Sequence, residues 1–178
     1  SCSGYTGEDG FELSVANDDA ESLARLLLNQ PQVAAIGLGA RDSLRLEAGL
    51  CLYGHELTDR ISPVGAGLRW AIARARRPGG DRAGGYPGAD QIAYELSNGT
   101  EKKRVGLKVA GKRPVREGQA VHTVDGALIG TISSGGFGPS VGAPVAMAFV
   151  DASVTEPGTE FQIDVRGTWI TAHVIALP

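Results

Sequence analysis

The chain has 178 residues, and its 17 basic and 20 acidic side chains give a net charge of −3 at pH 7. This balance provides no basic surface of the kind that binds nucleic acid. No apolar run approaches the roughly 20 residues of a membrane span. The length allows one large domain or two small ones. We therefore expect a loop-rich globular protein that uses neither nucleic acid nor membrane as a partner.

Metal-ligand patterns are missing from the sequence. Cys2 and Cys51 are the two cysteines, and they form no CxxC motif. His55, His122 and His173 are widely separated, without cysteine or carboxylate neighbours at ligand spacing. We expect reduced thiols and no metal site.

The first third of the chain alternates between extended and helical patterns. Residues 11–16 alternate like a strand. The Asn-Asp-Asp run at 17–19 supplies capping oxygens and negative charge for a helix to about residue 29, where Pro31 prevents continuation. Residues 33–38 fit a short strand or an entry loop. Residues 41–48 fit a strand or a helix on periodicity alone.

A change of composition follows. Residues 67–75 have the pattern of a helix that carries Trp70. Residues 74–85 then combine basic charge, a proline and four glycines, which predicts a domain boundary near residue 82. Two interpretations of this basic cluster stay open, a solvated loop and a docking patch for an acidic partner.

The second half reads as short strands between turns. Asp125-Gly126 is a strong two-residue hairpin signal. Six strands at roughly ten-residue spacing predict a small barrel or sandwich. The predicted strands are 104–109, 120–124, 128–132, 145–150, 160–165 and 169–175.

Three segments carry a family resemblance. They are GYTGEDGFE at 4–12, ARDSLRLEAGL at 40–50 with LYGH at 52–55, and GTISSG at 130–135. In this order and at these distances they resemble the glycine cleavage system T-protein, an aminomethyltransferase family. The resemblance covers nearly the whole chain.

The resemblance implies an α+β fold. Residues 1–82 would be the C-terminal part of a folate-binding domain, with a short helix at 41–48. Residues 83–178 would be a six-stranded Greek-key β-barrel. The chain would then be the C-terminal half of a longer protein. The family's catalytic aspartate would lie upstream of residue 1, so no catalytic residue is expected in this chain, and the chain alone would be inactive.

The resemblance also implies the reaction and its participants. The family transfers the methylene carbon from an aminomethyl-dihydrolipoyl arm, carried by the H-protein, to tetrahydrofolate, and releases ammonia. The expected cofactor is therefore tetrahydrofolate and the expected partner is the lipoyl-carrying H-protein. The location implied is the mitochondrial matrix in a eukaryote, or the cytoplasm in a bacterium.

Three residues match the family's folate-binding positions. The Glu12 carboxylate can accept the adjacent N–H donors of a pterin ring. The Arg41 guanidinium can donate to a ring carbonyl or a carboxylate tail. Tyr5 can cover one face of a flat ligand and offer its hydroxyl. Arg45 is a rival for the role of Arg41.

Two other functions stay open at this point. One is a folate-binding module of an iron–sulfur assembly protein. The other is the folate-binding part of a dimethylglycine- or sarcosine-type dehydrogenase. The GYTGEDG run at residues 4–10 favours the T-protein over both.

Overall fold

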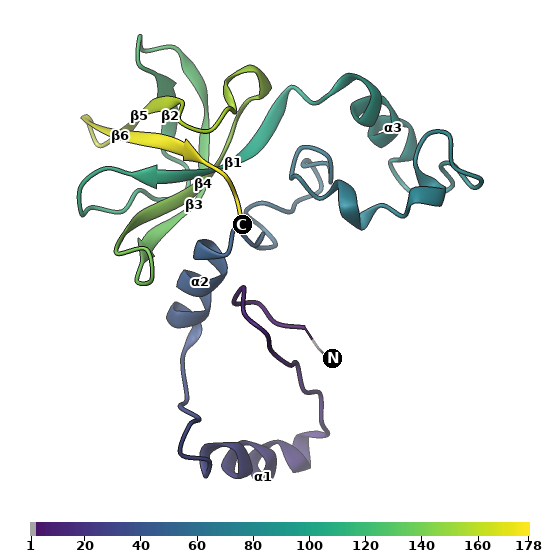
Figure 1. Ribbon diagram of the computed structural model, residues 1–178, viewed down its shortest axis with the longest axis vertical. Coiled ribbons are helices and arrows are strands. Elements are labelled where there is room, and N and C mark those ends of the chain that lie inside the picture. Colours follow the sequence, from purple (N-terminus) through teal and green to yellow (C-terminus); the bar gives the residue numbers. More distant parts are fainter. Residues whose placement is uncertain (1–2) are drawn as a thin grey trace.

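The computed structural model describes residues 3–178 and consists of a β-barrel with two helical extensions (Figure 1). One extension contains helix α3, Ala89–Asn98, and leads into the first strand of the barrel. The other reaches away from the barrel and ends at helix α1, Asn17–Leu28. The C-terminus lies at the centre, where the three parts meet (Figure 1). Cys2 lies outside the described residues.

The barrel is closed and its neighbouring strands are all antiparallel, in the order β1-β4-β3-β2-β5-β6. Because β1 lies beside β4 and not beside β2, the first four strands form a Greek key. The predicted six-stranded Greek-key barrel is confirmed, and the alternative of a sandwich is wrong. The strands are β1 Lys102–Val109, β2 Ala120–Thr123, β3 Leu128–Gly138, β4 Ala143–Asp151, β5 Glu160–Val165 and β6 Thr168–Ile175.

The barrel core follows from the alternation of the strands. In β5, Phe161, Ile163 and Val165 are buried and their neighbours are not. Strand β4 is buried almost throughout, because its outer face packs against helix α2, Leu38–Glu47. Fifteen buried residues form one continuous cluster inside the barrel. The barrel therefore has its own hydrophobic core.

Within residues 3–178, three α-helices lie outside the barrel: α1 Asn17–Leu28, α2 Leu38–Glu47 and α3 Ala89–Asn98. The first two confirm the predicted helix at 17–29 and the helix that the resemblance favoured at 41–48. The predicted helix at 67–75 is wrong. Two 3-10 turns, Arg69–Ala71 and Arg74–Arg76, replace it, because Ile72 between them adopts extended backbone angles.

The predicted strand at residues 11–16 is also wrong. This segment is extended but unpaired within the part of the chain described, and all six of its residues are exposed. A strand needs a neighbour for its backbone hydrogen bonds. Alternation alone therefore did not identify a strand here. Residues 33–38 likewise contain no strand, and α2 begins at Leu38.

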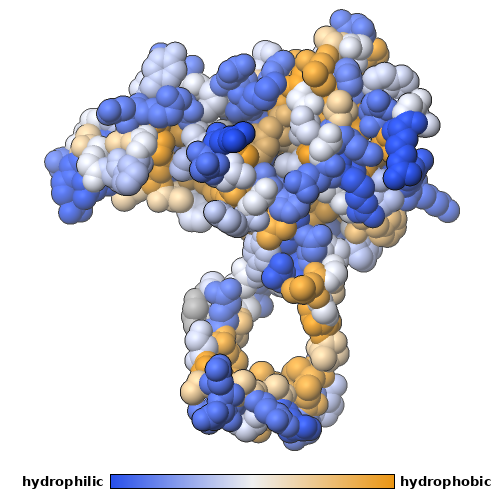
Figure 2. All heavy atoms as spheres, turned by 180° about the vertical axis from the view of Figure 1, so that it is seen from behind, coloured by the Kyte–Doolittle hydropathy of each residue, from blue (hydrophilic) through white to orange (hydrophobic). Residues whose placement is uncertain are grey.

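The extension that contains α1 exposes many apolar side chains. Figure 2 shows this part as an open ring with hydrophobic atoms along both sides. Apolar side chains here are 40–75% exposed, in contrast to the barrel core. They are Phe11, Leu13, Val15, Leu26, Leu27, Leu28, Val33, Ile36 and Leu38. This ring contributes little buried area to the stability of the fold.

Gly130 provides a test of the barrel's packing. A Cβ atom at this position would lie 2.0 Å from the carbonyl oxygen of Phe149 and 2.8 Å from the Cα atom of Val150, both in the backbone of β4. We expect Gly130→Ala to lower the free energy of unfolding by about 1–3 kcal/mol in urea denaturation. Gly39→Ala is the control, because its Cβ would meet nothing within 4 Å on helix α2. It should leave the free energy of unfolding unchanged or raise it by up to about 0.5 kcal/mol, because Gly39 lies in the first turn of the helix, where the preference for alanine is weaker than in its middle. Equal midpoints for the two variants would contradict this account.

Candidate functional site

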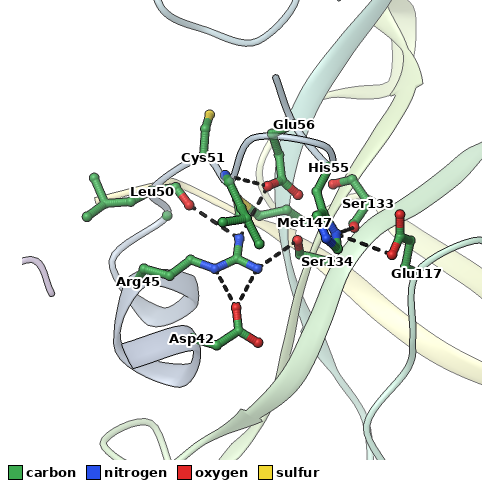
Figure 3. Close-up of polar contacts among 12 residues, drawn as sticks. Asp42, Arg45, Leu50, Cys51, His55, Glu56, Glu117, Ser133, Ser134 and Met147 are labelled. Carbon is green, nitrogen blue, oxygen red and sulfur yellow. Dashed lines mark hydrogen bonds and ion pairs between the residues drawn. The ribbon is translucent and has the colours of Figure 1, made fainter. Parts of the chain in front are cut away.

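The guanidinium of Arg45 is the centre of a buried polar network beside the barrel (Figure 3). Its side chain is 2% exposed. Both Nε and Nη2 lie close to Asp42 Oδ1, at 2.8 and 2.7 Å. Nη1 donates to Glu56 Oε2 at 3.2 Å and to the carbonyl of Leu50 at 3.4 Å. Nη2 donates to Ser134 Oγ at 3.0 Å. One side chain therefore joins helix α2, the loop after it, and the barrel.

Glu56 completes the network from the loop. Its side chain is fully buried, and Oε2 also accepts a hydrogen bond from the backbone N–H of Leu52 at 3.0 Å. A buried carboxylate is very costly unless it is paired and hydrogen-bonded. Arg45 and the Leu52 amide supply those partners for Oε2, whereas Oε1 is buried without a hydrogen-bond partner among the described residues. The loop at residues 50–56 is thus held against α2 by a charge pair.

A bulge in β3 presents two serines to this loop. The register with β4 shifts between Ile132 and Ser134, so Ser133 and Ser134 are both buried. Bulges re-aim side chains in this way. Ser134 accepts from Arg45, and the Ser133 carbonyl lies 3.1 Å from Nδ1 of His55. The bulge therefore supplies two of the barrel's contacts to the segment that carries the site.

The structure brings Tyr5 and Arg41 together. The guanidinium carbon of Arg41 lies 5.8 Å from the centroid of the Tyr5 ring. The Tyr5 hydroxyl donates a hydrogen bond to the carbonyl of Cys51 at 2.5 Å. Burial raises the pKa of the Tyr5 phenol, so the hydroxyl keeps the proton that it donates. An aromatic face and a forked donor are thus available side by side.

The glycine-rich loop approaches the end of α2 closely. Gly7 has φ +82°, and a Cβ atom there would lie 2.5 Å from the Cβ atom of Ala48. Glycine is therefore required both for the backbone conformation and for the contact. This packing places the loop, and with it Tyr5, beside the helix that carries Arg41.

Glu12 lies apart from the buried network. It is exposed on the extended segment between the glycine-rich loop and α1, and it accepts a hydrogen bond from Ser3 Oγ at 3.1 Å. Its role as a folate contact stays a prediction. Arg45, the rival of Arg41, has its donors committed to the protein interior. Of the two arginines, Arg41 is exposed and Arg45 is buried.

Sequence reasoning did not identify Glu56 or Ser134 as partners of Arg45. The Asp42 partner was detectable, because residues three apart lie on one face of a helix. Ser134 is 89 residues away in sequence, and its orientation depends on the bulge. No local pattern contains that information.

Two features are absent from residues 3–178. No group of three or more His, Cys, Asp or Glu side chains lies close enough to hold a metal ion there. Within the same residues, no helix is both long and apolar enough to cross a membrane.

The chain matches two models of one family along most of its length. Residues 1–76 match the GCVT N-terminal domain, and residues 102–178 match the glycine cleavage T-protein C-terminal barrel domain. The α+β architecture, the motif loop beside α2 and the Greek-key barrel agree with these matches. The chain belongs to the glycine cleavage T-protein family.

Named relatives and a solved structure are similar to nearly all of the chain. The mitochondrial aminomethyltransferase of Flaveria anomala is 44% identical over 177 residues, which are 98% of this chain and 42% of the relative. The mitochondrial enzyme of Gallus gallus is 43% identical over 98% of this chain and 43% of its own length. The crystal structure of glycine cleavage system aminomethyltransferase T from Bartonella henselae has a TM-score of 0.93 at 43% identity, covering 99% of this chain and 48% of that one. The chain thus spans less than half the length of these relatives.

The buried ion pair makes a direct prediction about stability. We expect Glu56→Ala to lower the free energy of unfolding by about 3–5 kcal/mol, because it leaves the Arg45 charge without its buried partner. Glu21→Ala is the control, since the Glu21–Arg25 pair on α1 is 75–77% exposed. That change should cost about 0.5 kcal/mol or less. Chemical denaturation measures both changes. Equal losses of unfolding free energy in Glu56→Ala and Glu21→Ala would contradict the stabilising role of the buried pair.

The environment of Cys51 predicts how its thiol reacts at a given pH. Burial, and then the charge of Glu56, raise the pKa of its thiol, although Arg104 and Arg45 oppose the shift. Only the thiolate reacts with iodoacetamide. At pH 8, Cys51 in the folded protein should therefore be labelled more slowly than in urea. The folded state holds this proton more tightly, so the contribution of Cys51 to stability falls as pH rises past the ordinary cysteine range. Peptide mass spectrometry separates Cys51 from Cys2, and equal labelling rates would contradict the burial argument.

Proposed function

We propose that the protein is an aminomethyltransferase of the glycine cleavage system. It would transfer the methylene carbon from the aminomethyl-dihydrolipoyl arm of the H-protein to tetrahydrofolate, with release of ammonia. The observation that carries the proposal is the pairing of Tyr5, in the motif loop, with Arg41 on α2, in a chain 43–44% identical to named aminomethyltransferases. No observation favours the iron–sulfur assembly module or the dehydrogenase.

Tetrahydrofolate fits the chemistry of the proposed residues. The ring of Tyr5 would cover one face of the pterin, and Arg41 would donate to its carbonyl or to the carboxylate tail. Glu12 would accept the ring N–H groups. None of these three groups breaks a bond. They would hold the cofactor while the amine is displaced, since positioning and exclusion of water supply much of the acceleration in such transfers.

The two parts of the chain would divide the work. Residues 1–82 would contribute the cofactor contacts, and residues 83–178 would form the barrel against which they are held. The relatives from Flaveria and Gallus are named mitochondrial. The matrix would be the location of this protein in a eukaryote, and the cytoplasm its location in a bacterium.

Replacement of Glu12 tests the cofactor site. In the full-length protein, Glu12→Ala should weaken tetrahydrofolate binding by about 2–4 kcal/mol, because the pterin donors lose a charged acceptor. Isothermal titration calorimetry measures the change. Glu21→Ala, on the exposed surface of α1, is the control and should bind as the unsubstituted protein does. Unchanged affinity in Glu12→Ala would remove Glu12 from the site.

The activity itself is tested with lipoylated, aminomethyl-loaded H-protein and tetrahydrofolate. The full-length protein should release ammonia and form methylene-tetrahydrofolate, and Arg41→Ala should raise the KM for tetrahydrofolate. Binding of tetrahydrofolate without release of ammonia would overturn the proposal in favour of a folate-binding module.

A further inference from the structure

The carbonyl group of Cys51 connects the buried ion pair to the candidate cofactor site. It accepts the hydrogen bond of the Tyr5 hydroxyl. The residues on either side are held by the ion pair. The carbonyl of Leu50 accepts from Arg45 Nη1 at 3.4 Å, and the amide of Leu52 donates to Glu56 Oε2 at 3.0 Å. The orientation of the Tyr5 acceptor therefore depends on backbone that Arg45 and Glu56 fix.

The barrel supplies the other end of this connection. Arg45 Nη2 donates to Ser134 Oγ at 3.0 Å, and both side chains are almost completely buried. A continuous series of hydrogen bonds thus runs from β3 through Arg45 and the loop backbone to the Tyr5 hydroxyl (Figure 3 shows its central part). The links between β3 and the Tyr5 hydroxyl are the Ser134–Arg45 bond at 3.0 Å, the Arg45–Leu50 bond at 3.4 Å and the Tyr5–Cys51 bond at 2.5 Å.

We propose that Arg45 and Glu56 are positioning residues for Tyr5. They hold the Cys51 carbonyl in place, and this carbonyl orients the Tyr5 ring for tetrahydrofolate. The inference rests on the proposed function, because it takes Tyr5 as a cofactor contact. Arg45 and Glu56 themselves do not touch the cofactor.

The physical reason is preorganisation. A contact residue serves a ligand well only when neighbouring groups hold its side chain within about 0.5 Å of the bound geometry. Tyr5 lies on a glycine-rich loop whose backbone is intrinsically permissive. Its hydroxyl bond to Cys51 replaces the restraint that a helix or strand would have supplied. Without the ion pair, the carbonyl and the ring would sample other positions, and binding would have to order them.

Two serines of the β3 bulge give a matched pair of variants. Ser134→Ala removes the hydroxyl that binds Arg45. Ser133→Ala removes a neighbouring buried hydroxyl that has no hydrogen-bond partner among the described residues. In the full-length protein, Ser134→Ala should raise the Kd of tetrahydrofolate about three- to tenfold, as expected for loss of one buried hydrogen bond in the series. Ser133→Ala should leave the Kd unchanged. Glu56→Gln should raise the Kd of tetrahydrofolate more than Ser134→Ala does. If Glu56→Gln does not fold, Ser134→Ala alone tests the proposal.

A double-mutant cycle distinguishes positioning from general destabilisation. Tyr5→Phe keeps the ring and removes the hydroxyl bond to Cys51. If Arg45 acts through that bond, Ser134→Ala should weaken binding no further in the Tyr5→Phe background. The kcat at saturating tetrahydrofolate should stay near that of the unsubstituted protein, with the loss confined to KM.

The outcomes are separable. Losses that multiply in the double variant, or equal losses in Ser133→Ala and Ser134→Ala, would overturn the positioning role while leaving the proposed function intact. Failure of the unsubstituted protein to bind tetrahydrofolate would overturn the proposed function and this inference together. The result that would support both the proposed function and the positioning role is a loss of tetrahydrofolate affinity in Ser134→Ala and Glu56→Gln. This loss should be absent from Ser133→Ala, and Ser134→Ala should cause no further loss in the Tyr5→Phe background.

Discussion

The burial of the Arg45 charge links helix α2, the loop after it and the barrel. A guanidinium that is 2% exposed must have its donors satisfied, and its partners come from its own helix, from the following loop and from the barrel. These partners, Asp42, Leu50, Glu56 and Ser134, thus belong to three different segments. The position of α2 relative to the barrel is therefore determined by the requirement to pair one charge, with the apolar contacts of Leu46, Val145 and Met147 added to it.

Other polar contacts across the same interface act in the same direction. Glu47 Oε1 accepts from the backbone amides of Ser140 and Val141, at 2.7 and 3.0 Å, and so joins the end of α2 to the turn between β3 and β4. Arg104 in β1 donates to the carbonyl of Gly49 at 2.6 Å. Carboxylate and guanidinium groups here bind backbone atoms, so they fix the path of the chain. The barrel consequently serves as the frame on which the motif loop is placed.

The success of sequence reasoning depended on whether the determining contact was local. The β5 strand was predicted at its observed bounds. The apolar residues Phe161, Ile163 and Val165 alternate with polar ones in the sequence, and this local pattern matches their alternate burial. Residues 11–16 show a similar alternation but have no partner strand in the described chain, so the same pattern gave a wrong prediction. Tyr5 and Arg41 were proposed as site residues from motifs, and that role stays a prediction. The contacts of Glu56 and Ser134 depend on a bulge and on burial that periodicity does not encode.

The two parts of the chain differ in what makes them ordered. The barrel is held by a continuous apolar core and closed hydrogen bonding, so its order is distributed over many residues. The motif loop has no such core, and Tyr5 is ordered through one hydroxyl bond and the close contact of Gly7 with Ala48. The position of Tyr5 therefore depends on contacts that connect it, through the Arg45 network, to the barrel. Under the positioning role that we propose, a change in β3 would alter the candidate cofactor site without touching it, because Arg45 and Glu56 lie between them and are both charged and buried.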